Sequence, residues 1–183
     1  MKLSLPLCCA TESFGLLSRQ ARSIESPEAL VNGAVAIALH QNKDIKAAEV
    51  NAELQSIADT IRSRVRGRQP QAMLAHLHGL LFDELGFVGD TEKYYSTDNS
   101  FLPSVLRTRR GLPITLSLIY KTVAQRLGMR SWGVALPGHF LVGVDAGDGP
   151  LLVDAFARGR VLTPDEAHDR LEEIFGEEVE WSS

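Results

Sequence analysis

The sequence predicts an α+β fold, with helices in the first half of the chain and a small antiparallel sheet in the second. Up to about residue 86, apolar residues recur at the spacing of amphipathic helices. After Gly128 the period changes to that of strands. The chain has 183 residues, the usual size of one domain, so we expect a single domain over residues 1–183.

The helical part is expected over about residues 11–86, and the core over about residues 87–175. Ser26 before Pro27 is typical of a helix start, and Asp44 can cap a second helix. A third helix runs from about Pro70 to Gly86, because glycine suits the left-handed position after a helix. The apolar positions of the second and third helices are Val50, Leu54, Ile57, Ala58, Ile61, Val65, Met73, Leu74, Leu77, Leu80, Leu81 and Leu85.

The core is expected to contain one very apolar helix, which begins at Leu112 and ends at Gly128. Because its first turns carry so little polar surface, we expect it to be covered on most sides. A short helix around residues 103–109 precedes it and is ended by Gly111. The strands are expected at residues 131–136, 139–145 and 150–156, with a hairpin turn at 146–149. A last amphipathic helix after Thr163 would contain Ala167, Leu171 and Ile174.

Composition and charge exclude several classes of partner. The net charge is −4 at pH 7, which argues against nucleic-acid binding, since phosphate contacts require a basic surface. No apolar run approaches the roughly 20 residues that span a bilayer, so no membrane partner is expected. The two cysteines, Cys8 and Cys9, are adjacent and imply no disulfide framework. The apolar run at the N-terminus is short and is interrupted by Pro6, so it does not fit a secretory signal. We therefore expect a cytoplasmic protein.

His139 and Asp154 form the first candidate site. In a hairpin closed by residues 146–149, His139 lies opposite residue 155 or 156, so Asp154 is within one or two positions of it. An acid beside an imidazole fixes the tautomer of the ring and stabilises its cation. A second interpretation is structural: Asp154 sits in an apolar strand, and a buried carboxylate needs a partner whatever its function.

Four short runs in this part of the chain resemble the bacterial SirB-one family, a branch of the transglutaminase-like superfamily. They are residues 99–102 (NSFL), 109–117 (RRGLPITLS), 137–142 (PGHFLV) and 153–156 (VDAF). The resemblance covers about residues 80–170. It implies a papain-like core, similar to that of cysteine proteinases, in which a helix packs on an antiparallel sheet. In active members the helix begins with a nucleophilic Cys, and a His and an Asp on neighbouring strands complete a triad.

By this resemblance His139 and Asp154 match the last two members of the triad, but the Cys position falls at Pro113 or Ile114. Neither residue can act as a nucleophile. Thr115 is one residue further and carries a hydroxyl, although Thr at a helix start is ordinarily a cap. A thiol of the N-terminal segment could also be delivered to the pair.

The second candidate site is the segment before the central helix. Tyr94, Tyr95, Asn99, Arg109 and Arg110 combine large contact areas with directed donors, which favours binding at the rim of a cleft. A structural interpretation is equally open, with the arginines tying the loop down.

No cofactor and no metal site are expected. His76 and His78 are two residues apart on a helix and point away from one another, and no phosphate-binding glycine motif is present. The sequence thus favours a non-catalytic binding or regulatory protein with a protein or peptide partner. The alternative is a hydrolase or acyl transferase that uses a hydroxyl, or a water activated by His139 and Asp154.

Overall fold

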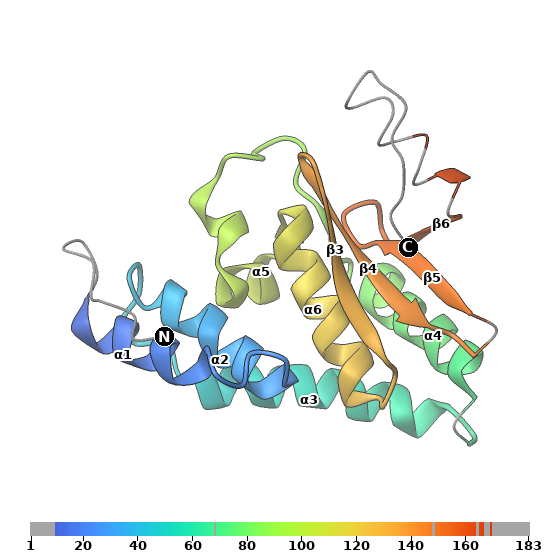
Figure 1. Ribbon diagram of the computed structural model, residues 1–183, viewed down its shortest axis with the longest axis horizontal. Coiled ribbons are helices and arrows are strands. Elements are labelled where there is room, and N and C mark those ends of the chain that lie inside the picture. Colours follow the sequence, from blue (N-terminus) through green and yellow to red (C-terminus); the bar gives the residue numbers. More distant parts are fainter. Residues whose placement is uncertain (1–9, 68, 148, 164, 167–168, 170–183) are drawn as a thin grey trace.

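The chain forms a layer of helices and a four-stranded sheet, with one helix between them (Figure 1). This computed structural model describes residues 10–67, 69–147, 149–163, 165–166 and 169. The helices before the core are α1 (Thr11–Gln20), α2 (Pro27–Ala38), α3 (Ala47–Arg64), α4 (Pro70–His78) and the π-helix η1 (Gly79–Glu84). Then follow β1 (Val88–Gly89), η2 (Thr97–Ser100), α5 (Leu102–Thr108), β2 (Arg110–Gly111) and α6 (Pro113–Arg126). The sheet consists of β3 (Ser131–Leu136), β4 (His139–Asp145), β5 (Pro150–Asp154) and β6 (Arg160–Leu162).

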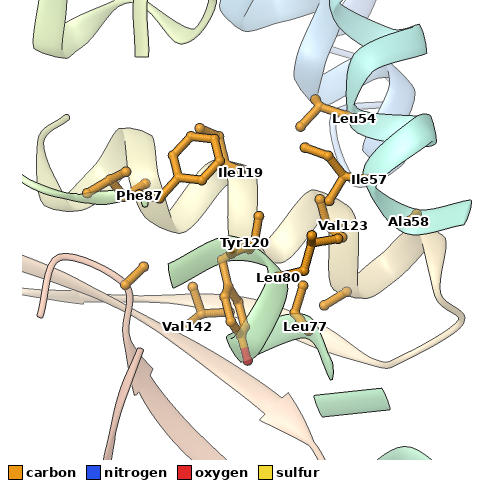
Figure 2. Packing of buried hydrophobic residues seen from close by; sticks show 14 of the residues in the cluster. Leu54, Ile57, Ala58, Leu77, Leu80, Phe87, Ile119, Tyr120, Val123 and Val142 are labelled. Atoms are coloured by element: carbon orange, nitrogen blue, oxygen red, sulfur yellow. The ribbon is translucent and has the colours of Figure 1, made fainter. Parts of the chain in front are cut away.

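Helix α6 is the central element, as its apolar sequence predicts. It packs on β3 and β4 on one side and on α2, α3, α4 and α5 on the other. Figure 2 shows this packing around Ile119, Tyr120 and Val123, with Leu54, Ile57, Ala58, Leu77, Leu80, Phe87 and Val142. The core helix expected from the sequence is confirmed, and so is the α+β class.

The sheet is antiparallel throughout, in the order β3-β4-β5-β6. Val142 pairs with Val153, which is the register expected from the hairpin turn. The third predicted strand was too long: β5 ends at Asp154, because its carboxylate accepts the amides of Phe156 and Ala157 and turns the chain. Strand β6 was not predicted.

Two predicted helix boundaries were wrong. Helix α3 begins at Ala47 with Lys46 before it, so Asp44 does not cap it; the Asp44 amide donates to Asn42 instead. Helix α5 is ended by Arg109 in the left-handed conformation (φ 61°), not by Gly111. Gly111 pairs with Gly89 in the parallel β1–β2 ladder, where a Cβ would lie 2.9 Å from the Val105 side chain.

Three other predicted helix boundaries, at Ser26, Gly86 and Thr163, are confirmed. The Ser26 hydroxyl accepts the Ala29 amide at 3.2 Å, and Gly86 has a φ of 73°. Thr163 and Glu166 exchange the two hydrogen bonds of a capping box. The positions Ala167, Leu171 and Ile174 of the last predicted helix lie outside the residues that the structure describes.

Candidate functional site

The site is built on a bond between His139 and Asp154. His139 is the first residue of β4 and Asp154 the last of β5, and antiparallel pairing brings these two strand ends together. His139 Nε2 and Asp154 Oδ2 are 2.8 Å apart. The two side chains are 10% and 1% exposed. The sequence-based expectation that an imidazole and an acid meet on neighbouring strands is therefore confirmed.

The buried carboxylate of Asp154 is satisfied on both oxygens. Oδ2 is hydrogen-bonded to Nε2 of His139. Oδ1 accepts hydrogen bonds from the backbone amides of Phe156 at 3.0 Å and Ala157 at 3.1 Å. These bonds offset the loss of water around the acid. With the Asp154 carboxylate as the acceptor, Nε2 of His139 is the donor and carries the proton of the neutral ring. Nδ1 is then the ring nitrogen that does not bond to Asp154.

A line of aromatic rings leads from the surface to His139. The ring centroids of Tyr95 and Tyr94 are 5.2 Å apart, those of Tyr94 and Phe156 6.1 Å, and those of Phe156 and His139 6.0 Å. Tyr95 is 95% exposed. A Cβ at Gly89 would lie 2.5 Å from the Phe156 ring, so this close approach requires a glycine. Phe156 was not singled out from the sequence, because an aromatic residue at a strand end is an ordinary core signal.

The N-terminal end of α6 lies at the same end of the molecule as the connection between β3 and β4 (Figure 1). One turn inside the helix, the Ser117 hydroxyl donates to the Phe140 carbonyl at 3.1 Å, which ties α6 to the start of β4. Strand alternation places His139 on the face of the sheet that carries Leu141, whereas Val142 belongs to the core around α6.

The helix tip consists of Pro113, Ile114 and Thr115, and none of these is a cysteine. Pro113 is buried and Ile114 is 55% exposed, and neither has a proton to transfer. The Thr115 hydroxyl is buried and donates to the Asn99 carbonyl at 2.8 Å, so it does not donate to the ring of His139. The hydroxyl protons of both Thr115 and Ser117 are thus used by backbone carbonyls.

Asn99 and Asp90 hold the segment before α5 in place. The Asn99 amide donates to Asp90 Oδ2 at 3.1 Å and to the Lys93 carbonyl at 2.7 Å. The backbone amide of Lys93 holds the pKa of Asp90 below its usual value, with Asn99 and the charge of Arg110 acting in the same direction. Asn99 is buried, so its amide shapes the loop that presents Tyr94 and Tyr95.

The two arginines are placed at the base of this loop. Arg109 pairs with Glu53 of α3 at 3.2 Å, and its guanidinium lies 4.7 Å from the centroid of the Phe87 ring. Its left-handed backbone fits the sharp exit from α5. Arg110 is exposed and lies close enough to Asp90 to influence its charge. Of the residues expected at the rim, the structure brings Tyr94 and Tyr95 into the aromatic line to His139.

Comparison with known proteins identifies the fold. Residues 48–183 match the family model of the transglutaminase-like superfamily. The chain belongs to the transglutaminase-like superfamily. Within this superfamily it is 38% identical, over 152 residues, to a UPF0162 protein of Xylella fastidiosa, which covers 82% of this chain and 54% of the relative. The UPF0162 protein of Pseudomonas aeruginosa is 32% identical over 143 residues, covering 77% and 52%.

A eukaryotic protein also resembles this transglutaminase-like chain. F-box only protein 21 of Mus musculus is 31% identical over an alignment of 167 positions, which covers 74% of this chain and 27% of that protein. The chain spans about half the length of the UPF0162 relatives. Within the described part of the chain no three His, Cys, Asp or Glu side chains are grouped to hold a metal, and no helix there is long and apolar enough to cross a membrane.

Proposed function

We propose that this transglutaminase-like domain is a non-catalytic binding or regulatory protein. It holds a protein or peptide partner at the end of the molecule where His139, Tyr94 and Tyr95 lie. The proposal rests on which residues occupy the N-terminal end of α6 and on the hydrogen bonds that they make. Pro113 and Ile114 occupy the expected Cys position, and the protons of the nearby hydroxyls are given to backbone carbonyls.

The His139–Asp154 bond fits this role without any chemistry. The buried carboxylate accepts hydrogen bonds from one ring and two backbone amides, so the pair fixes the ends of β4 and β5. It thereby sets the position of Phe156 and, through it, of Tyr94. The exposed Tyr95 ring offers a large contact area at a low cost in side-chain entropy, which suits a binding residue.

The alternative function is a hydrolase or acyl transferase. Its support is the tautomer of His139, in which Nδ1 is left to accept a proton from a water or a hydroxyl. In that case His139 is the base and Asp154 its orienting acid, while Thr115 would need to exchange its bond to Asn99 for one to the ring.

A capture experiment tests the binding function. The protein is immobilised and exposed to cytoplasmic extract, the compartment expected from its cysteine content, and bound proteins are quantified by mass spectrometry. We expect a partner that binds the wild type and is lost in Tyr95→Ala, but is retained in Glu92→Ala, a control in the same loop. A partner that survives both Tyr95→Ala and His139→Ala would show that this end of the molecule is not the contact.

A further inference from the structure

A groove runs along α6 on the side away from α4. Its volume is about 470 Å³, and its walls are α6, the edge of the sheet at β3, and the segment that joins α1 to α2. Its apolar lining comes from Ile24, Leu30, Ile114, Leu118, Trp132 and Phe140. Ile114 is also at the tip of α6, so one end of the groove lies at the N-terminal end of this helix.

Exposed apolar residues cluster on this groove. Ile114 is 55% exposed and Ile24 37%, and the two belong to different walls. Trp132, which is 36% exposed, borders the groove from the β3 edge, while its ring lies over Gly143. Single exposed apolar side chains are normal, but several around one concave surface indicate an interaction site.

The sheet offers backbone hydrogen bonds beside the groove. Strand β3 is an edge strand, since it pairs with β4 on one side and with no other strand in the part of the chain that the structure describes. Its residues Ser131, Trp132 and Gly133 line the groove. An open edge next to an apolar groove is suited to an extended chain, which adds to the sheet and places alternate side chains in the groove.

One cation in the groove, Lys121, shares the lining with the acid Glu25 but forms no ion pair with it among the described residues. Lys121 lies two turns from Ile114 on α6, and among the described residues its ammonium makes no hydrogen bond or ion pair within 4.0 Å. Burial lowers the pKa of this ammonium, and the carboxylate of Glu25 acts in the opposite direction from a greater distance. A partly buried charge without a close partner favours a ligand that brings the opposite charge.

We propose that the groove binds an extended apolar segment of a partner protein that carries one acidic side chain. The segment adds to the free edge of β3, its apolar side chains contact Ile24, Leu118 and Ile114, and its carboxylate pairs with Lys121. From Ile114 to Lys121 the groove follows about 10 Å of helix, the length of about three extended residues. This inference rests on the proposed binding function, and it names the class of partner and the surface to which the partner binds.

The test uses a displayed library of random 12-residue peptides, selected separately on the wild type, Lys121→Glu and Lys43→Glu. Lys43 is an exposed lysine that does not line the groove, so its replacement changes the net charge equally. On the wild type and on Lys43→Glu we expect alternating apolar residues with Asp or Glu at one position. On Lys121→Glu we expect Lys or Arg at that same position. Because Lys121→Glu could disturb folding, Lys121→Met serves as a second variant and should keep the apolar preference while losing the acidic one.

Synthetic peptides from the wild-type selection then measure affinity. Ile24→Ser should weaken binding about tenfold, the effect of losing one well-buried apolar contact. The proposal is overturned if the selection enriches no acidic position, or if Lys121→Glu selects the same peptides as the wild type. It is also overturned if the peptides lose affinity only in Tyr95→Ala and not in Ile24→Ser. That last result would leave the proposed binding function in place but would place the bound peptide at Tyr94 and Tyr95 and not in the groove.

Discussion

The Thr115 hydroxyl donates its proton to the carbonyl oxygen of Asn99 at 2.8 Å. This bond joins the first turn of α6 to the loop that carries Tyr94 and Tyr95. The one hydroxyl next to the expected Cys position is therefore a structural tie, and the Leu112 amide strengthens it by donating to the same carbonyl.

Thr115→Val tests this assignment. The variant removes a buried hydrogen bond at nearly constant volume, so we expect the free energy of unfolding to fall by about 1–3 kcal/mol. Thr115→Ser keeps the hydroxyl and should lose less. Urea denaturation gives both values. If Thr115→Val is as stable as the wild type, the hydroxyl does not hold the loop.

Asp154→Ala tests the pair as a structural unit. The change leaves His139 and two backbone amides without their acceptor in a buried site, and we expect a loss of about 2–4 kcal/mol. The matched control is Asp145→Ala in the same sheet, because Asp145 also accepts an amide two residues ahead but is exposed. This control should cost less than about 1 kcal/mol. Equal losses for the two variants, measured by denaturation, would contradict the role of Asp154.

The stability of the protein should decrease in mild acid because of His78. Its Nε2 lies 2.7 Å from the buried Tyr120 hydroxyl, and burial lowers the pKa of the imidazole, with the charge of Asp83 opposing this. The folded state therefore binds this proton less readily than the unfolded state. The stability that depends on neutral His78 is fully present above about pH 6.5, the pKa of a histidine in the unfolded chain. It is lost as the pH falls from there through the lower pKa of the folded state.

Unfolding free energies between pH 5 and pH 8 measure this effect. We expect a positive slope with pH in the wild type below about 6.5, and a smaller slope in His78→Gln. His76→Gln, on the same helix, is the control and should keep the slope of the wild type. A slope unchanged in His78→Gln would show that another group dominates.

A cysteine introduced at the α6 tip reports how close it lies to His139. In a background of Cys8→Ser and Cys9→Ser, the thiol of Pro113→Cys would stand at a helix N-terminus and near an imidazole, both of which favour the reactive thiolate. We expect iodoacetamide to react with it about tenfold faster at pH 7 than with a free thiol, and His139→Gln to remove part of this gain. Ile114→Cys, one residue along, is the comparison. A rate independent of His139 would place the pair out of reach of the tip.

The sequence predicts the sheet and its register because local turn residues specify both. Pro137 and Gly138 form a short turn between β3 and β4, and residues 146–149 form the turn of the next hairpin. Counting residues back from that second turn along both strands places His139 close to Asp154. The apolar residues of α6 likewise specify a covered helix without knowledge of its neighbours.

Other features depend on contacts between distant residues and carry no local signal. Strands β1, β2 and β6 have two or three residues each and exist only through their pairing partners. Asp44 has the chemistry of a cap, but the helix starts three residues later. The position of Phe156 between Tyr94 and His139 depends on the turn that Asp154 makes, and the free hydroxyl that Thr115 offers in the sequence is used by Asn99 in the fold.

The most direct measurement for the non-catalytic role is intact-protein mass spectrometry after incubation with activated esters, with Cys8 and Cys9 replaced by Ser. We expect no acyl adduct that depends on His139, because the hydroxyls at the α6 tip are bonded to carbonyls. Pro113→Cys in the same background is the positive control. A stoichiometric acyl adduct on Thr115 or Ser117 that disappears in His139→Ala would contradict the account and show a working acyl-transfer site.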